Sequence, residues 1–304
     1  LLKKEKVNNQ IISEITLFDI IEAPYPNNTN IPIQSKSGDI SDIDVSENLI
    51  LSKPDIIFHL AAIVSGQAEQ EFDLGWDINA KGSWGLFEAI RHQGENYCPR
   101  LVFTSSIAVF GAPFPDKIPD DFFTTPLTSY GAQKAISELL LADYSRKKMI
   151  DGVSIRLPTI CVRPGKPNLA ASGFFSGIIR EPLNGQEAIL PVNPDVRHWH
   201  ATPRAAAGFL VHAAEMDTSK LNDRITLNMP GLSVTVQEQI DALERVAGSD
   251  VVKLIKHQPD PTIQKIVSGW ARNFDTKRSI ELGFKAETNF DEIIKTYIED
   301  DLKK

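Results

Sequence analysis

The chain has 304 residues and a net charge of −8, with 24% charged and 42% hydrophobic residues. This composition is ordinary for a globular protein, and the length suits one large α/β unit or about two domains. Because the negative charge is spread along the chain without a basic run, neither nucleic acid nor an anionic membrane surface is expected as a partner.

Targeting and redox features of the sequence favour a cytoplasmic enzyme. No stretch has the roughly 20 apolar residues needed to span a bilayer, and the charged start, 1–7, is unlike a signal peptide. The two cysteines, Cys98 and Cys161, lie far apart and lack metal-type spacing. A disulfide framework or a zinc site is therefore not expected.

Strand-like and helix-like segments alternate in the first half of the chain. Residues 1–10 are predicted to be the end of a helix, 15–20 a strand that ends near an acid, and a second extended segment precedes Asp39. Further strands are predicted at 54–62, 101–106 and 152–157, and helical regions from Asp42, at 67–92 and at 127–148. This alternation predicts an α/β fold with a doubly wound parallel sheet of the Rossmann-like kind.

The pattern changes after Pro158, where residues 161–203 become rich in Gly, Pro, Asn and Ser. We predict a dinucleotide-binding domain over 1–160 and a smaller substrate-binding region over 161–304. Within the latter, about 203–230 return to the main sheet as a helix and a strand. Thr235 and Glu238 match a capping box that begins a helix to residue 246, and an amphipathic helix is predicted from Phe290.

One expected motif is not in the sequence. A dinucleotide-binding βαβ unit begins with a strand and a glycine-rich turn, whose amides hold the pyrophosphate. The first glycine here is Gly38, yet Asp19 stands where such a unit places its ribose-binding carboxylate. We therefore expect that the first strand and its glycine-rich loop precede Leu1 and are not part of this sequence.

The strongest chemical signal is the strand-like run Leu101-Val-Phe-Thr-Ser-Ser106 followed by Tyr130-Gly-Ala-Gln-Lys134. Ligands of open α/β sheets bind outside the carboxyl ends of the strands, which is where Ser105 and Ser106 lie. Tyr130 and Lys134 are four residues apart in a helical segment and so share one face. A phenol, an ammonium and a hydroxyl in one cleft are suited to proton transfer.

The spacing alone is a weak signal, because Tyr144 and Lys148 repeat it within the same helix. Tyr144 has neither a preceding loop nor a serine strand before it, and we interpret it as a residue of the helix face. The context of Tyr130 therefore selects it over Tyr144.

Several longer stretches resemble the extended short-chain dehydrogenase/reductase family, whose members include NAD-dependent epimerases and dehydratases. Within that family the chain is most similar to enzymes that oxidise D-erythronate. The stretches that carry the resemblance are 56–66, 102–112, 124–131, 156–168 and 197–201. Together they are far more specific than the Tyr-x-x-x-Lys spacing.

The resemblance implies a role for each catalytic candidate. Ser106 corresponds to the catalytic hydroxyl, Tyr130 to the general acid/base and Lys134 to the lysine that binds the nicotinamide ribose. Asp19 corresponds to the acid that hydrogen-bonds the adenosine ribose and favours NAD over NADP. The other implied cofactor contacts are Asp39, Ile40, Leu60, Ala61, Ala62, Asn79 and Pro158.

Departures from the nucleotide-sugar epimerases favour a smaller substrate. Those enzymes carry Asn where Thr159 stands, Tyr where Phe110 stands, and acidic residues within the stretch that matches 197–204. An arginine fork is instead expected to hold a substrate carboxylate, with Arg197 and Arg180 favoured over Arg163. The predicted substrate contacts are Ser65, Ser106, Tyr130, Thr159, Arg180, Arg197 and His200.

We therefore predict an NAD-dependent dehydrogenase that oxidises the 2-hydroxyl of D-erythronate, or of a close sugar acid, to the 2-keto acid. The alternatives are a nucleotide-sugar 4-epimerase or dehydratase with the same catalytic residues, and a non-catalytic NAD(H)-sensing protein. His59 is expected to be a core histidine. The helices from Gln67 and Ala132 are expected to bury apolar faces. The resemblance further implies that these helices form a helix bundle between two copies of the chain in a homodimer. Light scattering at micromolar concentration would check this expectation.

Overall fold

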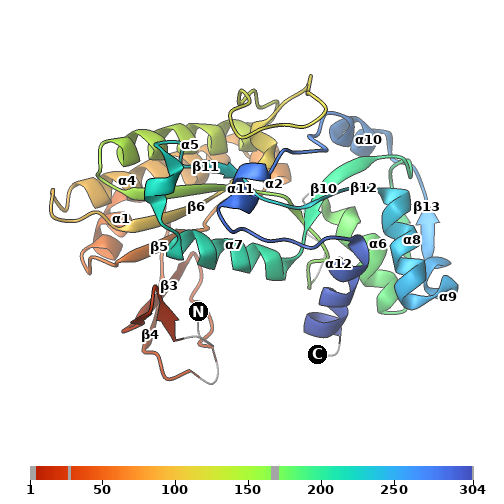
Figure 1. The fold of residues 1–304 in the computed structure, drawn as a ribbon, viewed down its shortest axis with the longest axis horizontal. Helices are drawn as coiled ribbons and strands as arrows, with labels where there is room; N and C mark the ends of the chain where they lie inside the picture. Colours follow the sequence, from red (N-terminus) through yellow and green to blue (C-terminus); the bar gives the residue numbers. More distant parts are fainter. Residues whose placement is uncertain (1–4, 27–28, 166–170, 303–304) are drawn as a thin grey trace.

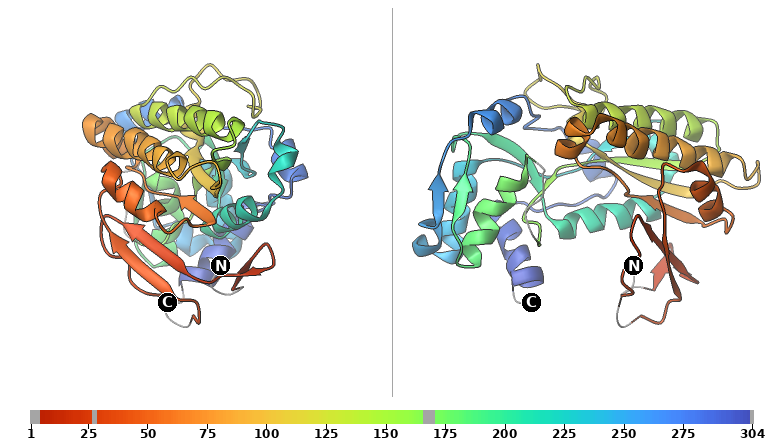
Figure 2. Two further views of the ribbon diagram at one scale, coloured as in Figure 1. Left: turned by 90° about the vertical axis from the view of Figure 1, so that its left-hand side faces the viewer. Right: turned by 180° about the vertical axis from the view of Figure 1, so that it is seen from behind.

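The computed structural model describes residues 5–26, 29–165 and 171–302. The first four residues of the predicted N-terminal helix end, and the last three of the 156–168 stretch, lie outside the described residues. Figure 1 and Figure 2 show a larger α/β part built mainly from the first half of the chain, beside a smaller part built from the second half.

The larger part is organised around a four-stranded parallel sheet with the order β11-β7-β6-β5. Its strands are β5 (Ile56–His59), β6 (Arg100–Ser106), β7 (Asp151–Leu157) and β11 (Thr226–Asn228). The central strands β6 and β7 are almost continuously buried because helices cover both faces of the sheet. Their apolar runs are the reason that the sequence predicts them well.

Helices lie on both faces of this sheet (Figure 1). On one face are α4 (Gly82–Arg91) and α5 (Ser129–Arg146), with α1 (Ile43–Ile50) packed against α4. On the other face α7 (Pro203–Glu215) packs against β6 and β7. The doubly wound, Rossmann-like fold class predicted from the strand–helix alternation is therefore confirmed.

The N-terminal segment differs from its prediction. Residues 6–11 form a hairpin of β1 (Lys6–Val7) and β2 (Gln10–Ile11) and not the end of a helix. Its two-residue turn, Asn8 and Asn9, has φ of 50° and 62°. Asparagine tolerates this left-handed conformation, and two such residues match the twist of a hairpin. The prediction was wrong because it overlooked this turn.

The next two strands form a separate two-stranded sheet. β3 (Ile15–Asp19) and β4 (Ile33–Ser37) pair in parallel, and the pairing brings Asp19 opposite Ser37. The four-stranded sheet ends at β5. Asp19 ends β3 and Asp39 follows β4, as the sequence predicts.

The predicted long helical region at 67–92 is divided into consecutive pieces. These are α2 (Ser65–Gln70), α3 (Phe72–Gly75), the π-helix η1 (Trp76–Lys81) and α4. Asn79 lies in the π-helical piece and is buried. A π-helical turn inserts an extra residue per turn and so redirects the side chains that follow, and such turns are frequent at functional sites.

The second half of the chain adds two small sheets. One has the order β12-β10-β8, from β12 (Leu232–Thr235), β10 (Arg197–Ala201) and β8 (Thr159–Ile160), and the other pairs β9 (Ala188–Leu190) with β13 (Ile255–His257). The remaining α-helices are α6 (Gly173–Leu183), α8 (Val236–Ala247), α9 (Ser249–Val252), α10 (Pro261–Ser268), α11 (Lys277–Glu281) and α12 (Phe290–Tyr297). Two short 3-10 helices, η2 (Ile107–Val109) and η3 (Thr218–Leu221), and the π-helix η4 (Ile298–Leu302) complete the fold. The predicted capping box is present, since Thr235 and Glu238 exchange hydrogen bonds at the start of α8.

Two clusters of buried side chains lie mainly in the two parts of the fold, and a third, which includes Phe110 and Phe274, contains residues from both halves of the chain. One core centres on β6, β7 and α7, and another on α6, α8 and α12. α7 and β11 belong to the first core although they follow residue 200, because β11 pairs with β7. A division near residue 160 stays a proposal.

Among the residues described by the structure, no helix combines the length and apolar character needed to cross a lipid bilayer.

Candidate active site

Ser106 is the last residue of β6, at the carboxyl edge of the main sheet. Its Oγ accepts a hydrogen bond of 3.1 Å from the backbone N–H of Ala108, which caps the short helix η2. This cap holds the hydroxyl at the strand end where the chain turns away from the sheet. Ser105 lies on the neighbouring position of β6 and is buried.

The helix that carries Tyr130 begins very close to this strand end. Thr128 caps α5 by accepting a hydrogen bond of 3.1 Å from the N–H of Gly131. A Cβ at position 131 would lie 2.2 Å from the carbonyl oxygen of Ala108, so only glycine allows this approach. Gly131 therefore lets the first turn of α5 pack directly against the segment that follows Ser106.

The approach brings Tyr130 and Ser106 together. The Tyr130 side chain is half-buried, and its phenol lies near enough to the Ser106 side chain to be influenced by it. Burial raises the pKa of the Tyr130 phenol to about 12, although the nearby Ser106 hydroxyl acts in the opposite direction. In the protein without a bound cofactor, this phenol is therefore protonated at neutral pH.

Lys134 supplies a positive charge beside Tyr130, one helical turn later. Its Nζ lies 5.8 Å from the centre of the Tyr130 ring and donates a hydrogen bond of 2.9 Å to the carbonyl oxygen of Thr104 on β6. Only 1% of Lys134 is exposed. Burial lowers the pKa of its ammonium to about 8, and the charge of Glu138 raises it. The structure thus places Tyr130 near both Ser106 and Lys134.

Asn79 is a buried bridge behind this cluster. Its side chain accepts from the N–H of Ile63 at 2.8 Å and donates to the Ile63 carbonyl at 3.1 Å. It also donates to Gln133 of α5 at 2.8 Å. Asn79 therefore fastens the segment that follows β5 to the helix that carries Tyr130 and Lys134.

The predicted cofactor contacts follow the carboxyl ends of β3, β4 and β5. Asp19 is exposed, and one carboxylate oxygen accepts from the N–H of Ile20 at 2.7 Å. Asp39 accepts from Ser41, and Ile40 beside it is buried. After β5, Leu60 is 52% exposed, whereas Ala61 and Ala62 are partly buried.

These residues fit a dinucleotide chemically. Asp19 is an exposed carboxylate at a strand end and has acceptor capacity left for ribose hydroxyls. Leu60 offers exposed apolar surface directly after β5. Lys134 is a buried cation next to the phenol, as a lysine that holds a ribose would be.

The predicted substrate-side residues are more dispersed. Pro158 follows β7 and is buried, and Thr159 begins β8, where its hydroxyl shares a hydrogen bond of 2.6 Å with His198. Ser65 begins α2 and is partly buried. His200 has no exposed surface and is hydrogen-bonded to Gln239 at 3.0 Å. Burial lowers the pKa of both histidines well below the usual value.

The two favoured arginines contact other parts of the protein. Arg180 donates to the carbonyl of Arg163 at 2.7 Å and pairs with Glu181 at 2.5 Å. Arg197 donates to the carbonyl of Ser233 at 2.6 Å and pairs with Glu238 at 3.2 Å. Among the described residues, no hydrogen bond or ion pair joins Arg180, Arg197 or His200 to Ser106 or Tyr130.

His59 has the structural role that the sequence suggested. It is buried on β5, hydrogen-bonded to Ser83 at 2.9 Å, and packs against the rings of Phe87 and Phe103. Burial and the charge of Lys134 lower the pKa of its ring to about 3. A neutral core histidine at this place does not act as a base.

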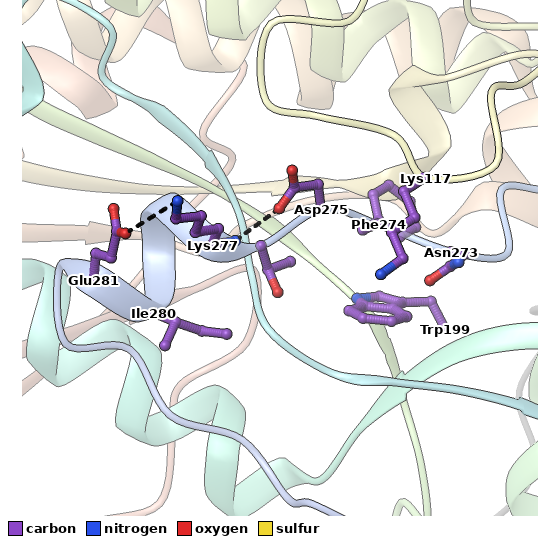
Figure 3. Close-up of a pocket in the computed structure, with 9 residues that line it drawn as sticks. Lys117, Trp199, Asn273, Phe274, Asp275, Lys277, Ile280 and Glu281 are labelled. Atoms are coloured by element: carbon purple, nitrogen blue, oxygen red, sulfur yellow. Dashed lines mark hydrogen bonds and ion pairs between the residues drawn. The ribbon is translucent and has the colours of Figure 1, made fainter.

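A pocket of about 630 Å³ lies elsewhere, between the segment around Lys117 and residues 273–281 (Figure 3). Its lining includes Trp199, which points into it from β10, and Phe274. None of the predicted site residues lines it. This pocket is therefore separate from the cluster of Ser106, Tyr130 and Lys134.

Sequence reasoning missed one part of the site. Glu138 and Arg156 form a buried ion pair beside Ser105, with a closest distance of 2.7 Å. Glu138 lies four residues after Lys134, a spacing that continues the Tyr130–Lys134 pattern and was visible in the sequence.

Comparison with known proteins identifies the class to which this fold and site belong. Residues 13–221 match the model of the NAD dependent epimerase/dehydratase family. The D-erythronate dehydrogenase of Cupriavidus necator is 45% identical over 95% of this chain and 88% of that protein. The enzyme of the same name from Haemophilus influenzae is 40% identical over 97% of this chain and 93% of that protein.

A solved structure has the same fold throughout. It is described as a nucleoside-diphosphate-sugar epimerase from Agrobacterium tumefaciens, with 54% identity and a TM-score of 0.97 over 99% of this chain and 89% of that chain. The present chain belongs to the NAD dependent epimerase/dehydratase family, and the resemblance seen in the sequence is confirmed. More particularly, it is a nicotinamide-dependent dehydrogenase of that family.

Proposed function

We propose that this protein oxidises the 2-hydroxyl of D-erythronate, or of a close sugar acid, to the 2-keto acid with NAD. The observation that carries the proposal is the placement of the Tyr130 phenol near Ser106 and beside the ammonium of Lys134. It is supported by identities of 45% and 40% to two D-erythronate dehydrogenases.

Each side chain has a defined task in this reaction. Ser106 orients the substrate hydroxyl, and the Tyr130 phenolate takes its proton as the C2–H bond breaks. The nicotinamide ring, when bound, accepts the hydride that leaves C2. The pKa of Tyr130 is raised to about 12 in the protein, where Lys134 is already in place. The positive charge of an oxidised nicotinamide ring, when bound, would therefore have to act together with that of Lys134 for the phenolate to form.

NAD is preferred over NADP because of Asp19. Its exposed carboxylate at the end of β3 is suited to accept hydrogen bonds from the two ribose hydroxyls. A phosphate on the 2′-hydroxyl would instead meet a like charge, which is unfavourable.

For the substrate carboxylate we now favour Arg163 over Arg180 and Arg197. Arg163 is half-buried and has no ion pair with a described carboxylate, whereas Arg180 and Arg197 are paired. Burial and the nearby charge of Arg180 lower the pKa of Arg163. A bound carboxylate would offset the repulsion between the Arg163 and Arg180 guanidinium groups, and would accept two hydrogen bonds from Arg163.

Replacing Arg163 by Met is expected to raise KM for the sugar acid at least about tenfold with little change in kcat, because a binding contact is lost. Arg197→Met is the matched control and should raise KM less than about twofold, since its guanidinium is held by Ser233 and Glu238. Steady-state kinetics of both variants tests this assignment. If Arg197→Met raised KM more than Arg163→Met, Arg197 and not Arg163 would be assigned as the residue that binds the substrate carboxylate.

A second candidate function follows from one comparison. The structure that is 54% identical to this chain is described as a nucleoside-diphosphate-sugar epimerase. The same serine, tyrosine and lysine serve that chemistry in the family, so the catalytic cluster does not separate the two functions. Phe110 and Thr159, at positions where epimerases carry Tyr and Asn, favour the dehydrogenase.

A substrate panel separates the two functions. Four- to six-carbon aldonates and UDP-sugars are incubated with NAD or NADP, using protein whose intact mass has been measured. We expect reduced cofactor to form with D-erythronate or a close aldonate and NAD, and at least about tenfold more slowly with NADP. Conversion of a UDP-sugar without net reduction of cofactor, together with inactivity on every aldonate, would contradict the proposed function.

A further inference from the structure

Glu138 is a buried carboxylate to which the proposed reaction has not yet assigned a role. Only 4% of it is exposed, although it lies on α5 where the opposite face is in contact with solvent. A buried carboxylate is costly unless it is paired and hydrogen-bonded. The groups that are hydrogen-bonded to the Glu138 carboxylate therefore indicate its role.

Those partners come from the two central strands of the main sheet. Arg156 of β7 donates to Glu138 Oε2 from Nη2 at 2.7 Å and to Oε1 from Nε at 2.9 Å. Ser105 of β6 donates to the same Oε1 at 2.5 Å. Ser105 and Arg156 are themselves direct neighbours in the β6–β7 register. One carboxylate thus joins α5 to both strands immediately before Ser106.

The same helix face carries the reaction centre. Tyr130, Lys134 and Glu138 are spaced by four residues, so their side chains follow one another along α5. Lys134 contacts β6 through Thr104, and Glu138 contacts it through Ser105. The end of β6 is therefore held against α5 at consecutive residues.

The charged groups around Lys134 come from several elements. Glu138 on its own helix favours the ammonium, and Arg156 of β7 lies on the far side of that carboxylate. From β5, His59 faces Lys134 as a neutral ring whose pKa is lowered to about 3. Among the described residues, Glu138 is thus the negative group that acts on Lys134.

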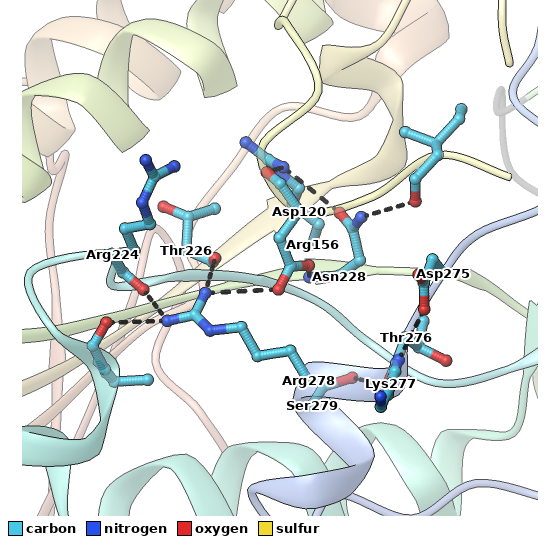
Figure 4. A network of polar contacts seen from close by, with 12 residues as sticks. Asp120, Arg156, Arg224, Thr226, Asn228, Asp275, Thr276, Lys277, Arg278 and Ser279 are labelled. Carbon is cyan, nitrogen blue, oxygen red and sulfur yellow. Dashed lines mark hydrogen bonds and ion pairs between the residues drawn. The ribbon is translucent and has the colours of Figure 1, made fainter.

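Arg156 also contacts a polar network that does not include Glu138 (Figure 4). Its Nη1 donates to the carbonyl of Asp120 at 2.9 Å, and its guanidinium lies 4.7 Å from the centre of the Phe110 ring. The Asp120 carboxylate accepts from the N–H of Asn228 at 2.6 Å and pairs with Arg278 at 3.4 Å. Arg156 therefore cannot turn away from Glu138 without breaking these contacts.

We propose that Glu138 is a positioning residue of the reaction centre, which sustains the positive charge of Lys134 beside Tyr130 and, through Ser105 and Arg156, holds the Ser106 end of β6 against α5. Its kinetic consequence rests on the proposed function, whereas its effect on Lys134 does not.

The first experiment observes Lys134 directly in the cofactor-free protein. Lysine side chains labelled with ¹³C at Cε are titrated by NMR in the wild type and in Glu138→Gln, with Lys134→Met to assign the signal. We expect the Lys134 titration to occur at least about one pH unit lower in Glu138→Gln. An unchanged titration of Lys134 would overturn the proposal, whatever the substrate is.

The second experiment measures the pH dependence of kcat with saturating aldonate and NAD. In Glu138→Gln the rising limb is expected to move up by about one unit, so that kcat at pH 7 falls about tenfold while the high-pH plateau stays within about twofold. KM should be unchanged. A merely structural role would instead lower kcat by the same factor at every pH, and this result would also overturn the proposal.

Two further variants control for charge and for folding. Glu88→Gln removes a carboxylate on α4 that contacts Tyr144 and Arg91, and should shift neither the titration nor the profile. The double variant Glu138→Leu/Arg156→Met removes the whole buried pair, a change that proteins often tolerate. This double variant should fold, and Lys134 should titrate in it at the same lowered pH as in Glu138→Gln. A shifted titration in a protein that oxidises no aldonate would leave this inference standing and contradict only the proposed function.

Discussion

Replacing Tyr130 by Phe is expected to lower kcat about 1000-fold or more, because the phenol oxygen is the base that accepts the proton of the substrate hydroxyl. General-base catalysis contributes about 100- to 10,000-fold in rate. The ring of Phe keeps the packing beside Lys134, so binding of NADH, followed by fluorescence, should change less than about threefold. Assays that compare kcat of the variant with kcat of the wild type measure this loss of activity.

The chain provides a matched control for this experiment. Tyr144 and Lys148 have the same spacing in the sequence, but Lys148 follows the end of α5, and the Tyr144 hydroxyl is hydrogen-bonded to Glu88 of α4. Tyr144→Phe should therefore retain kcat within about twofold. If Tyr130→Phe kept full turnover, the proposed role of the phenol would be wrong. If the wild type bound NADH but turned over no aldonate or UDP-sugar, the NAD(H)-sensing alternative would be favoured.

The elements of this fold that are predictable from sequence are those with strong local patterns. β6 and β7 are buried on both faces, so their apolar runs indicate strands regardless of the rest of the chain. The Thr235 capping box likewise marks a helix start within four residues. By contrast, the β1–β2 hairpin depends on the unusual backbone of Asn8 and Asn9, which a search for helical periodicity does not detect.

The candidate site divides in the same way. Ser106, Tyr130 and Lys134 were identified because a strand end and a spacing of four residues predict where side chains point. The pairings of Arg180, Arg197 and Glu138 depend on where long side chains end in three dimensions. Arg197 and its partner Glu238 are 41 residues apart in number and on different elements, and a charged residue is usually exposed. Nothing local therefore showed that Arg197 was already paired, whereas the partner of Arg180 is its sequence neighbour Glu181.

Lys134 gives the second large expected effect, in which activity and stability change in opposite directions. Replacing Lys134 by Met removes the cation beside Tyr130, and a cation at this range lowers a pKa by about 1–3 units. We expect kcat at pH 8 to fall about 100-fold, and affinity for NAD to fall as well because the proposed ribose contact is lost.

Stability is expected to respond the other way because the buried ammonium is itself unfavourable. Burial lowers the pKa of Lys134 from 10.5 in the unfolded chain to about 8 in the folded protein. Below pH 8 both states carry the charge, and the folded state is destabilised by about 3 kcal/mol relative to a neutral group. Between pH 8 and 10.5 the unfolded chain binds more protons, so the stability of the wild type rises with pH.

Met has a similar length and no charge, so Lys134→Met is expected to be at least as stable as the wild type at pH 7. The lost hydrogen bond to the Thr104 carbonyl offsets part of the gain, by about 1–3 kcal/mol. The free energy of unfolding in urea should favour the variant most at pH 7 and least near pH 10. A lysine kept only for structure would show the opposite result, with the variant several kcal/mol less stable at pH 7 and no dependence of the difference on pH. A buried charge that weakens the fold and is required for turnover is the expected property of a residue retained for the reaction.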